Sequence, residues 1–239
     1  MFIKPENFQA RCLRITRLNP KILEYEFEVL EHDFNFKAGQ FVMMNFDSLI
    51  DEQKKLSRAY SISTGPKPNR FELCVEIVPG GQAGAYFSAM QEGQVVDFKG
   101  PFGMCSIKPE NKNDLLMVAT GTGIAPIKSI LEDLAGRGDK RQVEVYFGLR
   151  YEEDVFYKQE ISDLVGQFPN SKFVLTLSKP SSGWSGASGR VTDYILGQGF
   201  RDNLDIYLCG NGNMIRDIRS HAIVEDVNKN QIHVEIFDS

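Results

Sequence analysis

The chain has 239 residues, of which 42% are hydrophobic and 25% are charged, and these proportions are typical of globular proteins. A net charge of −5 excludes a global positive field for nucleic acid, and no apolar run approaches the roughly 20 residues of a membrane helix. The first residues contain no apolar signal-peptide core, so we expect a cytoplasmic protein. The length allows one large domain or two small ones.

The first half of the chain has the rhythm of antiparallel strands, because short alternating or β-rich runs are separated by Pro, Gly and Asn. Six strands are expected, with one short helix at 83–90 before the last of them. The expected strands are 10–18, 22–30, 40–46, 58–63, 71–78 and 95–99. Short strands with turn signals indicate a small closed antiparallel β-barrel.

The second half alternates continuous apolar runs with helical patterns, which is typical of a parallel doubly wound α/β sheet. The expected strands are 115–119, 143–147, 173–177, 206–209 and 232–237. The expected helices are 126–135, 153–165, 191–196 and 213–224. A polar stretch at 107–113 separates the halves, so we expect two domains, 1–108 and 109–239.

Four cysteines are scattered through the chain: Cys12, Cys74, Cys105 and Cys209. They form no C-x-x-C pair, and no histidine stands close to any of them in sequence. This pattern argues against a zinc site, an iron–sulfur cluster held by this chain and a disulfide framework, so no bound metal is expected. Most of the cysteines are expected to be small core residues.

The segment Arg58-Ala59-Tyr60-Ser61 lies on an expected barrel strand, where alternation places Arg58 and Tyr60 on one face and Ser61 on the other. A flavin dinucleotide needs a cation at its pyrophosphate, a flat surface at its ring and a donor near the ring nitrogens. Gly80-Gly81-Gln82-Ala83-Gly84 then precedes a short helix, whose N-terminus suits a phosphate. Each segment alone also fits an ordinary strand or turn.

Two further segments follow parallel strands. Thr120-Gly121-Thr122-Gly123 joins an apolar run to a helix, the setting that dinucleotide phosphates prefer, although Pro126 replaces the third glycine of G-x-G-x-x-G. Cys209-Gly210-Asn211-Gly212-Asn213-Met214 follows a late strand, at the sheet edge where ligands bind. A buried strand-end cysteine and a plain turn would look the same, so the order of the segments is what indicates a flavin beside a nicotinamide.

With these segments in this order, and with Val234-Glu235-Ile236-Phe237 near the end, the chain resembles the ferredoxin–NADP reductase superfamily over essentially its whole length. The resemblance implies FAD in the barrel domain. Arg58 would bind its pyrophosphate, Tyr60 would pack against the flavin and Ser61 would approach flavin N5. Phe237 would cover the other face of the flavin. Further FAD contacts are implied for Cys74, Val75, Glu76, Gln82, Ala83 and Gly84, where many relatives carry Ser or Thr in place of Gly84.

The resemblance also implies NAD(P)H in the second domain. The loop Gly121-Thr122-Gly123 would bind it, with Thr122 between the two cofactors, and Cys209 and Glu235 would flank the nicotinamide. Gly210 and Met214 belong to the same nicotinamide segment. Ser61, Cys209 and Glu235 are therefore the expected catalytic residues.

The sequence gives conflicting indications about the choice between NADPH and NADH. Arg150 and Lys179 follow the second and third parallel strands, where NADP-specific relatives place cations for the 2′-phosphate. Ser178-Lys179-Pro180 and Trp184-Ser185-Gly186, however, resemble the relatives that use NADH. The charges favour NADPH.

The expected function is a reductase that takes a hydride from NAD(P)H onto FAD and passes electrons singly to a carrier such as ferredoxin or flavodoxin. The chain lacks the C-x4-C-x2-C pattern of relatives fused to a ferredoxin, so the carrier would be a separate protein. Two alternatives are a flavin reductase that releases reduced flavin and a non-catalytic subunit that regulates or tethers a partner enzyme.

Overall fold

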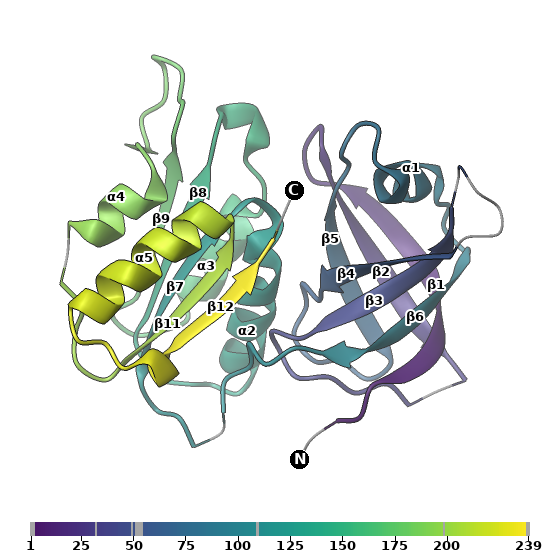
Figure 1. Cartoon of the computed structure of the whole chain (residues 1–239), viewed down its shortest axis with the longest axis horizontal. Helices are drawn as coiled ribbons and strands as arrows, with labels where there is room; N and C mark the ends of the chain where they lie inside the picture. Colours follow the sequence, from purple (N-terminus) through teal and green to yellow (C-terminus); the bar gives the residue numbers. More distant parts are fainter. Residues whose placement is uncertain are drawn as a thin grey trace.

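The computed structural model describes residues 3–31, 33–48, 50, 55–108, 110–197 and 199–237, and it consists of two sheets that lie side by side (Figure 1). The first sheet is antiparallel, with the order β4-β3-β6-β1-β2-β5. Its elements are β1 (Glu6–Arg17), β2 (Ile22–Leu30), β3 (Phe41–Asp47), β4 (Lys55–Ser61), β5 (Arg70–Glu76), α1 (Gln82–Ala89) and β6 (Val95–Phe102). Six strands and one helix follow the sequence-based expectation.

This antiparallel sheet curls into a barrel around an aromatic core. Its two edge strands come together at a bridge between Ile62 and Leu73, next to a backbone hydrogen bond of 2.9 Å from Ser63 N–H to the Glu72 carbonyl. Inside, Phe27 and Phe71 are stacked with their ring centroids 5.3 Å apart, and both are almost fully buried. The packed rings hold β2 and β5 together inside the barrel.

The second sheet is parallel, with the order β10-β9-β8-β7-β11-β12, as expected for a doubly wound domain. Its strands are β7 (Asp114–Thr120), β8 (Val143–Leu149), β9 (Lys172–Leu177), β10 (Ala187–Ser188), β11 (Leu204–Gly210) and β12 (Ile232–Ile236). Its α-helices are α2 (Ile124–Gly136), α3 (Lys158–Val165), α4 (Val191–Leu196) and α5 (Gly212–Val224). Helices α2 and α3 pack in one buried cluster with the sheet, and α4 and α5 pack in another.

One helix begins later than the sequence pattern predicted. We expected a helix over 153–165, but a short 3₁₀ turn, η2 (Glu152–Asp154), comes first and α3 starts at Lys158. Tyr157, which precedes α3, has a left-handed backbone with φ of 54°, and this conformation interrupts the helical path. The two-residue strand β10 was also missed, because so short a run has no detectable periodicity.

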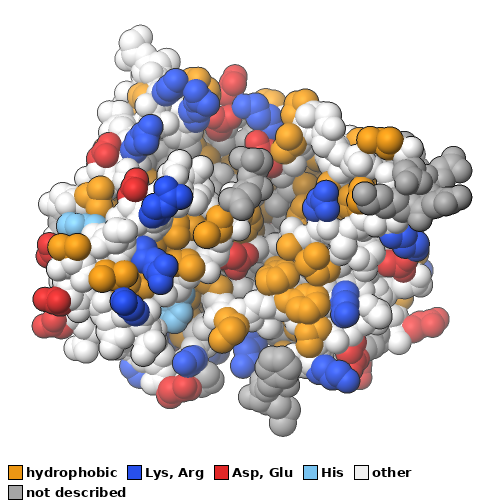
Figure 2. Space-filling model, in the orientation of Figure 1, with side chains coloured by type: hydrophobic (Ala, Val, Ile, Leu, Met, Phe, Trp, Pro, Cys, Tyr) orange, Lys and Arg blue, Asp and Glu red, His pale blue; other side chains and the backbone are white. Residues whose placement is uncertain are grey.

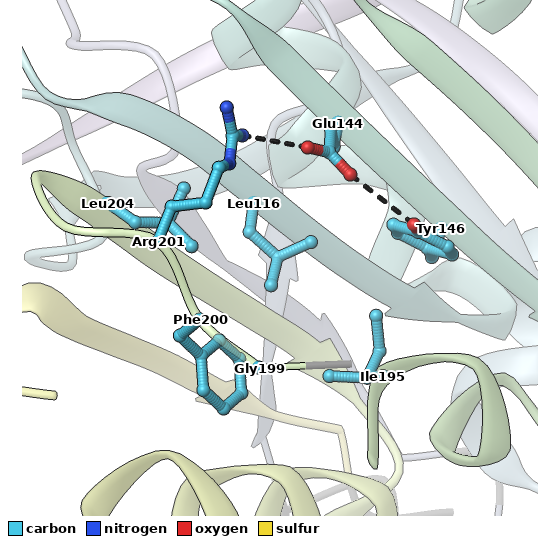
Figure 3. A pocket seen from close by; sticks show the side chains of 8 residues that line it. All are labelled: Leu116, Glu144, Tyr146, Ile195, Gly199, Phe200, Arg201 and Leu204. Atoms are coloured by element: carbon cyan, nitrogen blue, oxygen red, sulfur yellow. Dashed lines mark hydrogen bonds and ion pairs between the residues drawn. The ribbon is translucent and has the colours of Figure 1, made fainter. Parts of the chain in front are cut away.

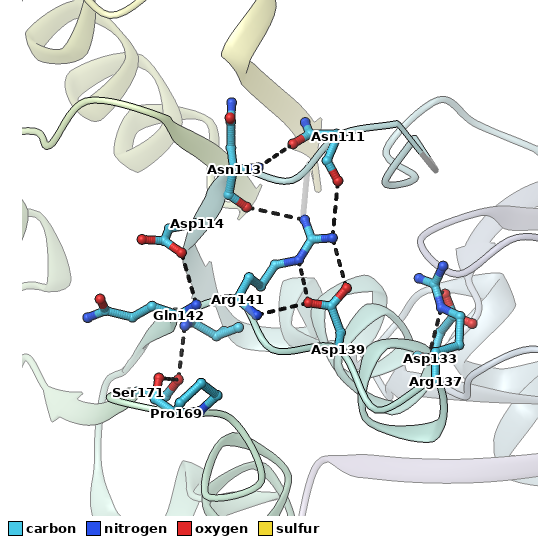
Figure 4. A network of polar contacts seen from close by, with 11 residues as sticks. Asn111, Asn113, Asp114, Asp133, Arg137, Asp139, Arg141, Gln142, Pro169 and Ser171 are labelled. Carbon is cyan, nitrogen blue, oxygen red and sulfur yellow. Dashed lines mark hydrogen bonds and ion pairs between the residues drawn. The ribbon is translucent and has the colours of Figure 1, made fainter.

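The segment between the two domains is fixed to the second domain by Arg141 (Figure 4). The guanidinium of Arg141 donates to the carbonyls of Asn111 and Asn113, both at 3.2 Å, and is bound through two contacts of 2.9 Å by Asp139. Hydrogen bonds from Arg141 lower the pKa of Asp139 to about 2. The linker is therefore a well-bonded part of the second domain.

The surface in Figure 2 carries basic and acidic side chains interspersed over both domains, with no single large field of one sign on this face.

All four cysteines of the sequence lie in the described part of the chain, where each is buried and forms no disulfide. Across the described ranges, no helix combines the length and apolar character needed to cross a bilayer.

Candidate active site

Two of the three expected catalytic residues meet where the two domains touch. Ser61 ends β4 of the barrel, and its hydroxyl donates a hydrogen bond to the Glu235 carboxylate on β12. Burial raises the pKa of Glu235, and the hydrogen bond from Ser61 opposes that shift. The barrel strand predicted to hold the flavin thus contacts the last strand of the parallel sheet directly.

The third expected catalytic residue, Cys209, pairs with Glu235 in the register of β11 and β12. Its side chain is fully buried in a hydrophobic cluster that contains residues of both domains, and it does not line the open cleft. A hydrogen bond with the Cys105 thiol and burial both raise the pKa of Cys209, so its sulfur is held as a neutral thiol. Whether it acts in the reaction stays a prediction.

The two glycine segments of the second domain fit against each other backbone to backbone. A Cβ at Gly123 would lie 2.5 Å from the Cys209 carbonyl oxygen, and a Cβ at Gly210 would collide with Thr120. Asn211 N–H also donates to the Thr120 hydroxyl at 2.9 Å. Glycine at these positions is what allows the loop after β7 and the end of β11 to form one continuous surface.

That surface opens into a cleft of about 750 Å³ at the carboxyl ends of the parallel strands. The second domain contributes most of the lining, including Gly121, Arg150, Lys179 and Met214 from the sequence-based prediction. The barrel contributes Asn19, Lys21, Ile22 and Glu76. A cleft between the domains at this edge can hold a dinucleotide.

Sequence reasoning missed several residues of this cleft. The missed polar residues include Asn19, Lys21, Asp154, Arg190, Thr192, Asn211, Asn213 and Asp217. One of them had a signal: Asn211 stands directly before a helical pattern, and its side chain caps α5 by accepting from the N–H groups of Asn213 and Met214. Asn19 and Lys21 had none, since they come from a turn in the other domain.

Four cations line this cleft. Lys21 is paired with Asp154 at 3.0 Å, and the other three are Arg150, Lys179 and the unpredicted Arg190. Arg150, Lys179 and Arg190 are exposed, and in the described part of the chain none of these three forms an ion pair with a carboxylate. Arg150 lies over the ring of Tyr151 at 5.3 Å. Guanidinium and ammonium groups in this state can bind a phosphate.

On the barrel side, the two segments predicted for FAD come together through an aromatic contact. The ring of Tyr60 on β4 meets the ring of Phe87 on α1 edge-on, with centroids 5.0 Å apart. Arg58 is exposed and donates to the carbonyl of its neighbour Ser57 at 2.9 Å, which leaves further donors on its guanidinium. Burial raises the pKa of Tyr60 to about 12.

The start of α1 suits an anionic group. Its N-cap is Gly81, which has no side chain to accept from the first turn of the helix. A Cβ at Gly84 would lie 2.7 Å from the Val78 carbonyl oxygen, so glycine allows this helix to approach the chain before it. The packing therefore leaves no room for a side chain at Gly84.

Cys74, Val75 and Glu76, for which FAD contacts are implied, form the end of β5. Cys74 and Val75 have buried side chains on β5, while Glu76 is exposed and lines the cleft.

Phe237, which follows β12, is half-buried, and its N–H donates to the Gly210 carbonyl at 2.9 Å. This bond fixes the end of the described chain beside the glycine turn of β11.

A second, smaller pocket of about 170 Å³ lies near the opposite edge of the same sheet (Figure 3). Its charged groups are bound to each other, because Arg201 contacts Glu144 at 2.7 Å and the Tyr146 hydroxyl donates to the same carboxylate at 3.3 Å. This pocket therefore offers no free cation for a phosphate.

Comparison with known proteins agrees with this arrangement. Residues 11–107 match the family model for the oxidoreductase FAD-binding domain, and residues 117–220 match that for the oxidoreductase NAD-binding domain. Ferredoxin–NADP reductase B of Sorangium cellulosum is 31% identical over 99% of this chain and 100% of its own length. The chain belongs to the ferredoxin–NADP reductase family.

Other relatives share the same two domains. The phenol hydroxylase P5 protein of Acinetobacter pittii is 27% identical over 97% of this chain and 66% of its own length. A ferredoxin NADP+ reductase from Neisseria gonorrhoeae, solved with FAD and NADP bound, is 23% identical and has a TM-score of 0.81 over 98% of this chain and 99% of its own. This chain is accordingly a flavin oxidoreductase that binds FAD in its barrel and NAD(P) in its parallel-sheet domain.

Proposed function

We propose that this protein takes a hydride from NAD(P)H onto FAD and passes the electrons one at a time to a separate carrier, a ferredoxin or a flavodoxin. FAD supplies the conversion, because it accepts two electrons from a nicotinamide and can release them singly. The observation that carries the proposal is the hydrogen bond from Ser61 to Glu235, which joins the flavin strand to the coenzyme domain.

Ser61, Glu235 and Cys209 are the proposed residues around the reacting atoms. The hydroxyl of Ser61 is oriented by its bond to Glu235, so it faces the junction in one defined direction. Burial disfavours negative charge on both Glu235 and Cys209, which suits a place from which water is excluded.

FAD is proposed to lie along β4 and α1. Arg58 and the start of α1 would hold its pyrophosphate, Tyr60 would support the flavin, and Phe237 would cover the other face. The exposed guanidinium of Arg58 and the glycine N-cap of α1 support this placement. The other proposed FAD contacts are Ala59, Cys74, Val75, Glu76, Gln82, Ala83 and Gly84.

The nicotinamide dinucleotide is proposed to occupy the cleft of the second domain, with its phosphates at Gly121, Thr122, Gly123 and Gly210 and with Met214 beside them. Arg150 and Lys179 would bind a 2′-phosphate, so NADPH would be preferred. Arg190, which lines the same cleft, adds a third cation to this argument.

We also propose that the domains divide at residues 1–108 and 109–239 and that the protein works in the cytoplasm. The ends of the two matched regions, at 107 and 117, support the division. Four unpaired thiols suit a reducing compartment.

The test is anaerobic stopped-flow mixing of the FAD-loaded protein with NADPH and with NADH, followed by addition of oxidised ferredoxin or flavodoxin. Bleaching of the flavin and then single-electron reduction of the carrier are expected. Bleaching with release of free reduced flavin would instead indicate a flavin reductase, and no bleaching would indicate a non-catalytic subunit.

A further inference from the structure

Helix α2 is hydrogen-bonded to the segment that follows β4, the strand proposed to hold the flavin. Each of the three residues that follow Ile62 is bound through its backbone by one side chain of the helix. The contacts are Lys128 Nζ to the Ser63 carbonyl at 3.3 Å, Ser129 Oγ to the Thr64 carbonyl and Gly65 N–H to Glu132 Oε2 at 2.8 Å. A Cβ at Gly65 would lie 3.1 Å from that of Glu132, so the helix and the segment pack closely.

Lys128 is the centre of this contact. Its side chain is only 2% exposed, and it forms ion pairs with Glu132 at 2.7 Å, Glu160 at 3.1 Å and Glu72 at 3.4 Å. Glu72 belongs to the barrel, and the other two carboxylates belong to the second domain. Burial alone would lower the pKa of Lys128, but the three carboxylates raise it above its ordinary value, so the ammonium stays charged.

This contact joins two segments that each lie next to a proposed cofactor site. Helix α2 begins at Ile124, directly after the glycine loop 121–123 that is proposed to bind the coenzyme. The hydrogen-bonded residues 63–65 begin two positions after Ser61, which ends β4. A rigid helix therefore links the place of one cofactor to the place of the other.

A buried ion cluster of this kind is costly to desolvate and is weak evidence for stability, but its directional bonds define one relative orientation of the groups it joins. We propose that Lys128, with Ser129 and Glu132, forms an interdomain clamp that sets the position of the flavin strand relative to the coenzyme loop. Lys128 is then a positioning residue for hydride transfer, a role that rests on the function proposed above.

The test compares Lys128→Met with Lys128→Arg in FAD-loaded protein. Because misplacement by 1 Å can cost about a hundredfold in rate, Lys128→Met should slow flavin reduction at saturating coenzyme by about tenfold or more. The dissociation constant of the coenzyme should change little, and Lys128→Arg, which keeps the cation, should recover most of the rate.

A second readout is independent of activity. Hydrogen exchange of the Gly65 amide, whose N–H is bound by Glu132, should become about tenfold faster in Lys128→Met, while amides of β6 should keep their protection. The matched control is Arg137→Met, since Arg137, the C-cap residue of α2, pairs with Asp133 at 2.7 Å with the same i,i+4 spacing. In the described part of the chain Arg137 forms no hydrogen bond or ion pair with a barrel residue. Arg137→Met should change neither readout.

If Lys128→Met fails to fold, Glu72→Gln replaces it, because that change removes only the carboxylate on the barrel side, and the same two effects are expected at smaller size. Unchanged reduction and exchange in the folded variant would overturn the clamp, as would equal slowing in Arg137→Met. A wild-type protein that neither coenzyme reduces would refute the proposed function instead.

Discussion

The parallel sheet has cations at the carboxyl ends of its strands, here called the carboxyl edge, and at their amino ends, the amino edge. The two sets of cations have opposite surroundings. At the carboxyl edge, Arg150, Lys179 and Arg190 line the cleft, and in the described ranges no carboxylate forms an ion pair with them. At the amino edge, Arg141 is bound by Asp139 and Arg201 by Glu144, both within 2.9 Å. The difference teaches that the role of a cation here depends on whether the protein itself supplies its counter-charge.

The largest expected effect is at the carboxyl edge. Each charge-assisted bond from Arg150 or Lys179 to a 2′-phosphate should contribute about 1.5–3 kcal/mol to NADPH over NADH. The double Ala variant should lose NADPH preference by at least about a hundredfold, since 1.4 kcal/mol is about tenfold. Steady-state kcat/KM for both coenzymes at fixed ionic strength measures this, with Arg201→Ala as the amino-edge control. A wild type that prefers NADH would contradict the charge argument and favour the pattern around Trp184.

The comparison extends to the barrel, where Arg58 is a further exposed cation that lacks a carboxylate partner among the described residues. Arg58→Ala should weaken FAD binding by about 1.5–3 kcal/mol, or about tenfold to a hundredfold, without changing the fold. Titration of the apoprotein with FAD, followed by flavin fluorescence, gives the affinity. Unchanged affinity, or colourless wild-type protein that FAD cannot reconstitute, would remove the flavin assignment from this strand.

A neutral residue at the carboxyl edge gives a finer test. Cys209→Ser should leave folding and FAD content intact and slow flavin reduction by about tenfold, a rise of about 1.4 kcal/mol in the barrier. Single-turnover mixing with NAD(P)H separates this rate from coenzyme binding. If the rate does not change, Cys209 is a core residue like the other three cysteines.

The smallest effect is expected at the amino edge, where the charge is already paired. The pKa of Asp139 is lowered to about 2, so its ionised form stabilises the folded state above pH 4, and this contribution is lost as the pH falls towards 2. Asp139→Asn should cost about 1 kcal/mol at pH 7, a value reduced by solvent screening, and almost nothing near pH 2. Urea unfolding at both pH values tests this, and flavin reduction at pH 7 should be unaffected.

The sequence alone predicted most of the fold, because strands such as β2 and β8 and helices such as α5 carry clear periodicity. It also singled out Gly121 and Arg150 because they follow strand ends, and both line the cleft, while their binding to the coenzyme stays a prediction. It could not show the burial of Lys128, since its partner Glu72 is 56 residues away in the other domain. The late start of α3 was equally hidden, because Tyr157 adopts its left-handed backbone without a glycine or proline to signal it.

The bond between Ser61 and Glu235 joins two residues that are synthesised at different times. The two residues are 174 positions apart, and translation proceeds at about 5–20 residues per second, so Ser61 emerges about 9–35 s before its partner. A nascent barrel that folds in this interval presents the end of β4 to solvent. Flavin bound at that stage would be open to oxygen and other reactants until β12 has been made and Glu235 meets Ser61.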